Sequence, residues 1–241
     1  MRKLVLGAAA LIALAQPAMP ADLRLPVKAP PLVARAWSWT GCFAGGHVGG
    51  IWDSEKWINR TPGGDFFGEL LGEHTASGVI GGAQAGCDYQ FAGPFVIGIQ
   101  GDVGFTDASG ANASVHEIGV AYHSRVENLT SVTGRFGYAF DRFLGYVRGG
   151  AAWERDNYWA TQTMLGLPYT SRETRSGWTI GVGGEYAFTN NLSAFVEYNY
   201  YDFGSSAVPL TPLVPGLRPA LVDIRESAGV VRAGVNLRFG G

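Results

Sequence analysis

The chain has 241 residues, which is enough for one large β-domain. Only 16% of the residues are charged, against roughly 25% in soluble domains, so much of the folded surface is not expected to face water. With 20 acidic and 18 basic residues the chain has no basic excess, so nothing in its charge indicates nucleic acid as a partner, and none is expected.

Residues 1–21 have the pattern of a secretory signal peptide. Two basic residues precede an apolar run from Leu4 to Leu14, and Ala21 is a plausible cleavage point. A membrane anchor is the alternative, but this run is much shorter than the ~20 residues that cross a bilayer as a helix. Residues 22–36 contain three prolines and no periodicity, which predicts an extended periplasmic linker. Residues 37–241 are expected to form the folded domain.

Eight segments of this domain alternate apolar and polar side chains with the period of a β-strand. Each is longer than the ~5–6 residues common in soluble strands and reaches the ~9–11 residues that cross a membrane at a tilt. The segments are Trp39–Trp52, Gly78–Phe91, Pro94–Thr106, Val126–Tyr138, Phe143–Glu154, Gly177–Phe188, Leu192–Phe203 and Ala228–Phe239.

The connections between these segments alternate in length. The short ones are residues 92–93, 139–142 and 189–191, and the long ones are residues 53–77, 107–125, 155–176 and 204–227. Outer-membrane barrels have short periplasmic turns and longer extracellular loops. The sequence therefore predicts an all-β fold, an eight-stranded antiparallel up-and-down transmembrane β-barrel in the cell outer membrane.

In each segment one face is apolar, and the other face collects the charges. A soluble ligand-binding barrel would turn the apolar face inward, whereas a membrane barrel turns it toward lipid. The scarcity of charge, the aromatic residues at strand ends, the strand length and the export signal favour the membrane barrel. Its lumen would be just wide enough for side chains to fill.

Charged residues of the polar face are expected to form an ion-pair network in the lumen, because an unpaired buried charge is costly. Sequence order favours a pair between Arg148 and Glu185. The network either plugs the lumen or lines a narrow, gated ion path. Its expected members are Arg135, Arg148, Glu185, Glu197 and Arg232.

The two cysteines bear on strand register. If Trp52 and Ser77 flank the first loop symmetrically, positions whose numbers sum to 129 face each other, and Cys42 and Cys87 meet this condition. Export permits a disulfide, but a bond between neighbouring strands is geometrically demanding. The residues leave open both a disulfide and two free thiols on the apolar face.

No motif indicates a cofactor, a metal site or an enzyme. The four histidines lack metal-ligand spacing; His47 is expected in the lumen, and His74, His116 and His123 in loops. A hydrolase that uses a loop histidine is the alternative to a non-enzymatic protein.

Several segments resemble the outer-membrane immunogenic protein family, which are small OmpA-like barrels of Gram-negative bacteria. They are Ser38–Gly41 with Gly45 and Gly46, Gly134–Ala139, Tyr146–Gly150, Gly177–Thr179, Glu185–Phe188 and Glu197–Gly204. The resemblance implies an eight-stranded barrel, assembly by the outer-membrane insertion machinery and surface antigenicity, with no catalytic residues. The family usually has aromatic residues where Cys42 and Cys87 stand. It ends at or near a terminal Phe of the insertion signal, the place that Phe239 takes here before two glycines.

The expected function is a structural role in envelope integrity and in surface interaction as an antigen. The expected surroundings are outer-membrane lipid and lipopolysaccharide, and the long loops would meet host or phage ligands. A small porin that passes ions or small solutes through the lumen is the alternative.

Overall fold

The computed structural model describes residues 37–63, 67–113, 120–162, 167–212 and 220–240. The expected signal peptide, residues 1–21, and the expected linker, residues 22–36, lie outside these ranges. Within them the chain is a single antiparallel sheet, and no helix there has the length and apolarity needed to cross a membrane.

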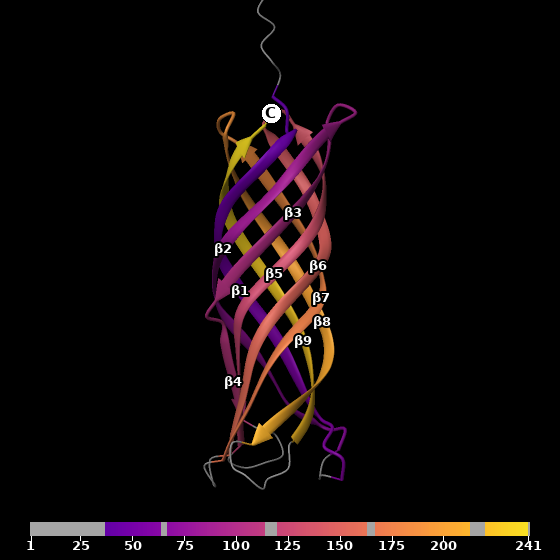
Figure 1. Ribbon diagram of the computed structural model, residues 1–241, viewed down its shortest axis with the longest axis vertical. Coiled ribbons are helices and arrows are strands. Elements are labelled where there is room, and N and C mark those ends of the chain that lie inside the picture. Colours follow the sequence, from indigo (N-terminus) through magenta and orange to yellow (C-terminus); the bar gives the residue numbers. More distant parts are fainter. Residues whose placement is uncertain (1–36, 64–66, 114–119, 163–166, 213–219, 241) are drawn as a thin grey trace, which may run out of the picture. The chain divides into compact units, whose positions relative to one another are not determined.

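The sheet closes on itself into a barrel (Figure 1). All pairings are antiparallel, and β1 pairs with both β2 and β9, so the ring has no open edge. The strands are β1 (Gly41–Asn59), β2 (Leu70–Phe91), β3 (Phe95–Thr106), β4 (Ser109–Ala113), β5 (Val120–Phe140), β6 (Phe143–Gln162), β7 (Leu167–Ala187), β8 (Leu192–Pro212) and β9 (Ala220–Phe239).

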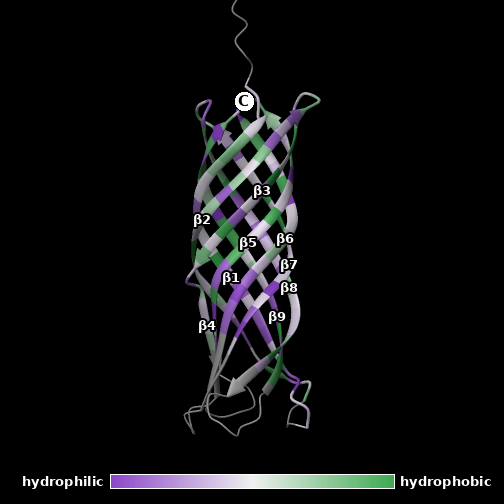
Figure 2. Cartoon of the chain, in the orientation of Figure 1, coloured by the Kyte–Doolittle hydropathy of each residue, from purple (hydrophilic) through white to green (hydrophobic). Residues whose placement is uncertain are grey.

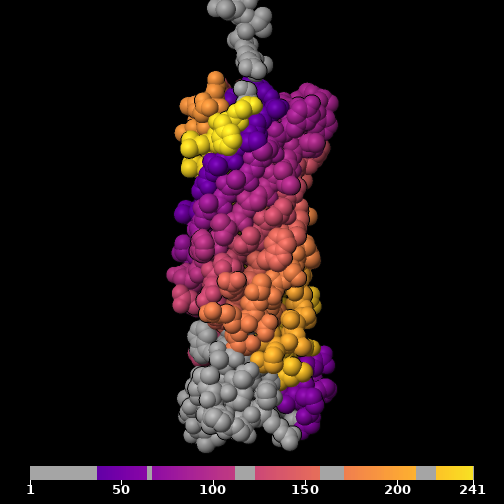
Figure 3. Space-filling model, viewed as in Figure 1, coloured from indigo at the N-terminus to yellow at the C-terminus, as the bar shows by residue number. Residues whose placement is uncertain are grey.

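Eight positions make up the ring, because β3 and the short β4 share one of them. β3 pairs with β2 and β5, and after a break at Asp107 and Ala108, β4 pairs with the same two strands. The expected eight-stranded up-and-down barrel is confirmed. The bands of colour that run diagonally over the surface show the tilt of the strands (Figure 3).

Most of the four long loops expected from the sequence are strand, so that expectation was wrong. Apart from β3 and β4, the strands have 19 to 22 residues. Their added length carries polar side chains on the outside, for example Ser54 and Lys56 on β1 and Arg155 on β6. The apolar face therefore ends long before the backbone pairing does, and the end of the apolar face had been mistaken for the end of the strand.

The outer face of the barrel carries an apolar band between two rings of aromatic side chains, as in outer-membrane barrels. The ring at the end with the short turns, the turn side, includes Tyr89, Phe95, Tyr138, Phe143, Tyr186 and Phe239. The second ring, here called the loop-side girdle, consists of Trp52, Phe105, Trp153 and Trp178, which are 40–63% exposed. Past this girdle most outward side chains are polar, although Leu70 is 42% exposed. Hydrophilic stretches occur along the strands in the loop half of the barrel (Figure 2). The membrane-spanning segments therefore end at the girdle, and the strands continue beyond it.

The register of β1 and β2 is the one expected from the sequence. Trp52 lies opposite Ser77 and Cys42 lies opposite Cys87, so facing positions sum to 129. The two cysteines form a disulfide, which decides between the two alternatives that the sequence left open. The bond ties neighbouring strands together near the turn side, and Cys87 lies on the outward face.

This disulfide predicts a measurable loss of stability on reduction. The bonded residues are 45 positions apart, and the chain-entropy model gives about 4 kcal/mol for a loop of that length. A chain with both cysteines replaced by serine should unfold at lower urea concentration than the oxidised chain. Alkylation of the denatured protein, followed by mass analysis, should find two reactive thiols only after reduction. Thiols that react without reduction would contradict the bond.

Candidate functional site in the barrel interior

Closure of the ring turns one face of every strand into the lumen, and charged side chains gather there. Eight of them are at most 6% exposed, and they come from every position of the ring except β1. The eight are Asp88 on β2, Asp102 on β3, Arg135 on β5, Arg148 on β6, Glu185 on β7, Glu197 on β8, and Arg232 and Arg238 on β9.

Four of these residues form a cluster that we call the central quartet: Asp102, Arg148, Glu197 and Arg232. Arg148 lies 2.9 Å from the Glu197 carboxylate and 2.5 Å from that of Asp102. Arg232 contacts the same two carboxylates, at 2.5 Å from Glu197 and 2.8 Å from Asp102. Each guanidinium is thus paired with two carboxylates, and each carboxylate with two guanidinium groups.

Neutral groups complete the shell of the central quartet. The hydroxyl of Tyr146 donates to Glu197 at 2.7 Å, and the hydroxyl of Ser131 donates to Asp102 at 2.9 Å. Glycine at position 183 makes room for this arrangement, because a Cβ there would lie 2.7 Å from the Tyr146 hydroxyl. Buried ion pairs are stabilising only when their remaining hydrogen-bonding positions are also satisfied.

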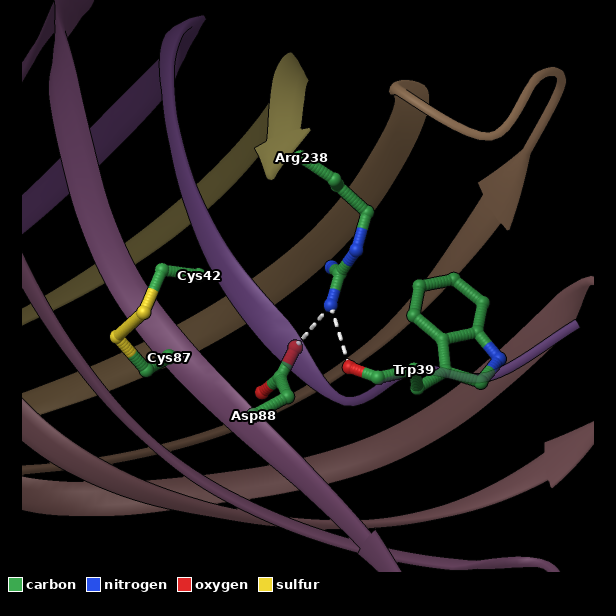
Figure 4. Close-up of a disulfide and its surroundings, with 5 residues drawn as sticks. All are labelled: Trp39, Cys42, Cys87, Asp88 and Arg238. Carbon is green, nitrogen blue, oxygen red and sulfur yellow. Dashed lines mark hydrogen bonds and ion pairs between the residues drawn. A yellow bond between two sulfur atoms is a disulfide. The ribbon is translucent and has the colours of Figure 1, made fainter. Parts of the chain in front are cut away.

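The other four residues form the turn-side quartet: Asp88, Arg135, Glu185 and Arg238. Arg135 lies 3.1 Å from Asp88 and 2.9 Å from Glu185. Arg238 lies 2.8 Å from Asp88 and 3.0 Å from Glu185. Arg238 also donates to the backbone carbonyl of Trp39 at 2.9 Å (Figure 4). The two quartets together hold four positive and four negative groups.

Apolar layers lie on both sides of the quartets. The layer on the turn side consists of Trp39, Val96, Ala139, Leu144, Tyr146 and Ala187. The layer on the loop side includes Ile51, Ile80, Leu129, Tyr201, Phe203 and Val230. The quartets are therefore enclosed by side chains along the axis of the barrel as well as around it.

All five residues expected in the lumen lie there, but they are divided between the two quartets and their pairing differs from the expected one. Arg148 contacts Glu197 and Asp102, so the expected pair with Glu185 was wrong. The reason is strand stagger: Glu185 on β7 lies opposite Leu144 on β6, four residues nearer the turn than Arg148. Asp88, Asp102 and Arg238 were not among the expected members, although strand alternation puts them on the same face as the other charges.

A second group of charges lies past the loop-side girdle, outside the membrane-spanning segments. We call it the acidic cluster, and its members are Asp53, Glu55, Glu154, Asp156 and Glu226, each at most 1% exposed. Arg175 contributes a guanidinium, 3.2 Å from Glu226. Sequence reasoning missed this cluster as a unit, because all of its members except Glu154 were assigned to loops.

Burial and mutual repulsion act on the protonation of this cluster. Burial first, and the nearby Glu226 second, raise the pKa of Asp53 well above its usual range. The same two causes raise the pKa of Glu55 to about 8. Burial and the neighbouring Asp156 raise the pKa of Glu154 well above its usual range. The ionised cluster is therefore strained by its own charge.

His47 and His74 are not placed as the base of a Ser-His-acid triad, and His74 lies on β2 and His123 on β5 rather than in loops. His47 faces the lumen and is hydrogen-bonded to Gln84 at 2.7 Å. His74 uses the same ring nitrogen, Nε2, toward Ser124 at 3.0 Å and toward Glu55 at 3.8 Å. A Ser-His-acid triad needs the carboxylate on the opposite ring nitrogen. His116 lies outside the described residues.

Comparison with known proteins places these features in a family. The family model described as "Outer membrane protein beta-barrel domain" matches residues 6–239. The 31 kDa outer-membrane immunogenic protein of Brucella melitensis biotype 1 is 28% identical over 232 residues, which cover 92% of this chain and 93% of the relative. The 25 kDa outer-membrane immunogenic protein of Brucella abortus biovar 1 is also 28% identical, over 234 residues that cover 95% and 97% of the two chains.

Solved structures of other outer-membrane proteins share the fold. OprG from Pseudomonas aeruginosa has a TM-score of 0.53 at 12% identity, covering 85% of this chain and 99% of that one. The outer membrane protease OmpT from Escherichia coli has a TM-score of 0.51 at 9% identity, covering 85% and 98%. Identities this low establish a common fold and carry no activity from one protein to another. The family match over nearly the whole chain agrees with the closed ring and its outward apolar band, and the chain belongs to the outer membrane protein beta-barrel domain family, whose place is the bacterial outer membrane.

Proposed function

We propose that this chain is a closed, non-enzymatic barrel that contributes to envelope integrity and presents a surface for recognition. The observation that carries the proposal is the pairing of the two quartets. Four guanidinium groups and four carboxylates fill the lumen and neutralise one another. A solute would have to break several buried ion pairs to pass, and leaving one buried charge without its partner typically costs about 3–5 kcal/mol.

The immunogenic relatives support the recognition part of the proposal. Both relatives are named as outer-membrane immunogenic proteins, and the similarity spans almost their whole length. In this chain the parts of the strands past the loop-side girdle would form the exposed surface, together with the connections between them. Lipopolysaccharide around the girdle, and host or phage molecules at the rim, are the partners that this placement favours.

Delivery to the membrane would depend on the end of β9. Phe239 is the last residue of the strand, lies opposite Cys42 and points outward with 54% of its surface exposed. This outward aromatic position supports its proposed role in the signal that the insertion machinery reads.

A planar-bilayer recording tests the closed lumen. We expect the purified, folded barrel to produce no large, reproducible conductance steps, because side chains fill the lumen of an eight-stranded barrel. A porin of known conductance, inserted from the same detergent into the same lipid, shows that the bilayer reports channels. Regular steps from this chain under those conditions would favour the porin alternative.

The quartets are also expected to stabilise the fold. Replacing Glu185 with Gln removes one charge from the turn-side quartet and leaves Arg135 and Arg238 with one carboxylate, Asp88, between them. The free energy of unfolding should fall by about 3–5 kcal/mol. Heating in detergent, followed by gel electrophoresis, should show loss of the folded, faster band at a lower temperature.

Glu73→Gln is the matched control for this substitution. Glu73 forms an ion pair with Lys56 on the outside of the barrel, where both side chains are 59% exposed. An exposed pair contributes about 0–1 kcal/mol, so the control should melt close to the unchanged protein. Equal melting temperatures for Glu185→Gln and the control would rule out a stabilising role for the turn-side quartet.

A further inference from the structure

The acidic cluster differs from the two quartets in its charge balance. It contains five carboxylates, and one of them, Glu226, pairs with the guanidinium of Arg175. One nitrogen of Arg175 donates to the backbone carbonyl of Ile224 at 2.8 Å, so part of its hydrogen-bonding capacity is used by the backbone. If all five carboxylates are ionised, the cluster carries a large negative charge that these groups do not neutralise.

The carboxylates converge on two small volumes. Oxygen atoms of Asp53, Glu55 and Glu226 all lie within 4.8 Å of one another, and so do those of Glu154, Asp156 and Glu226. Glu226 belongs to both groups, so the two volumes are adjacent. This convergence is not a feature of a solvated acidic surface, because all five side chains are buried.

Two of the carboxylates lack hydrogen-bond donors. The carboxylate of Asp53, which is 0% exposed, has another carboxylate, that of Glu226, as its hydrogen-bonding neighbour, and no N–H or hydroxyl group in the described part of the chain donates to its oxygens. No such group donates to either side-chain oxygen of Glu154, which is 1% exposed. Buried polar groups normally have a partner, so an orphaned carboxylate in the interior indicates a missing one. Each of the two convergent groups contains one of these orphaned carboxylates.

We propose that the acidic cluster binds calcium. The first group of ligands is Asp53, Glu55 and Glu226, and the second group is Glu154, Asp156 and Glu226. Hard divalent cations take oxygen ligands, and every ligand offered here is a carboxylate oxygen. Calcium–oxygen distances of about 2.3–2.6 Å allow two ligands of one ion to lie up to about 5 Å apart, and the oxygens of each group, which lie within 4.8 Å of one another, fall inside that limit. Magnesium binds at about 2.0–2.1 Å and retains several waters, which suits this enclosed cluster less well.

Because the ligands come from opposite sides of the ring, a bound ion would link strands that do not otherwise pair. β1 and β6, which carry Asp53, Glu55, Glu154 and Asp156, are four positions apart in either direction around the eight-position ring. They therefore belong to opposite walls, and Glu226 on β9 lies next to β1. Calcium at the cluster would join opposite walls of the barrel beyond the loop-side girdle.

The test uses the full chain, refolded from denaturant into detergent micelles with calcium, with magnesium, or with a chelator. After gel filtration in metal-free buffer, elemental analysis measures the metal that remains bound. We expect stoichiometric calcium on the folded chain, and a rise in Tm of roughly 5–10 °C at about 100-fold excess of calcium over its Kd. Magnesium should produce a much smaller rise.

The informative variant is the double substitution Asp53→Asn with Glu154→Gln. It removes one orphaned carboxylate from each group and keeps the side-chain shapes, so the barrel should fold without metal at least as well as the original chain. Bound calcium and the calcium-dependent rise in Tm should both disappear. Glu73→Gln removes a carboxylate from the outside of β2 and should retain both.

Three outcomes would overturn the proposal. The original chain could bind no calcium and show the same Tm with calcium and chelator, in which case protons alone neutralise the cluster. It could retain magnesium in preference to calcium, which would reject the calcium assignment. Calcium binding by the double variant at the level of the original chain would place the ion elsewhere. The calcium titration of the original chain decides the matter even if the double variant does not fold.

Discussion

Closure of the sheet is the constraint on which the rest of this structure depends. A sheet that surrounds itself has an outside that faces lipid and an inside that faces only its own side chains. No backbone edge is left without a partner, and every charge on the inner face has to be compensated within a narrow space. Alternation along each strand then sorts the residues automatically. Apolar side chains go to the lipid, and the charged ones meet in the lumen.

Much of the fold could be read from the sequence, because strand alternation is a local property. The position of Glu185 relative to its neighbours Gly184 and Tyr186 is enough to place it inside once the direction of the apolar face is known. The register of β1 and β2 also followed from local symmetry about the first connection, which placed Cys42 opposite Cys87. Whether the two thiols bond depends on their side-chain geometry, which the sequence does not contain.

The partners of the charged residues could not be read in the same way. Which carboxylate Arg148 meets depends on the stagger of strands around the whole ring, a cumulative quantity to which every turn contributes. The acidic cluster was missed for a different reason. Asp53 and Glu226 lie where the outward side chains are already polar. Inward and outward positions are both polar there, so the alternation of apolar and polar residues that identified the strands is absent from the sequence. The backbones of neighbouring strands nevertheless remain paired past the loop-side girdle, so alternate side chains such as Asp53 still point into the barrel.

The length of the strands past the loop-side girdle has a consequence for how the protein is seen from outside. Outward side chains in this region touch neither lipid nor the packed interior, so substitution there disturbs nothing that the fold requires. Lys56 and Glu73, for example, meet across two strands although many residues separate them in the chain. An antibody that binds this outer surface would recognise a discontinuous epitope, made of residues from two neighbouring strands. A synthetic peptide with the sequence of either strand alone would contain only half of that epitope. If this outer surface is the recognised surface proposed above, its outward residues could change while the inward residues beneath them stay the same and the fold is kept.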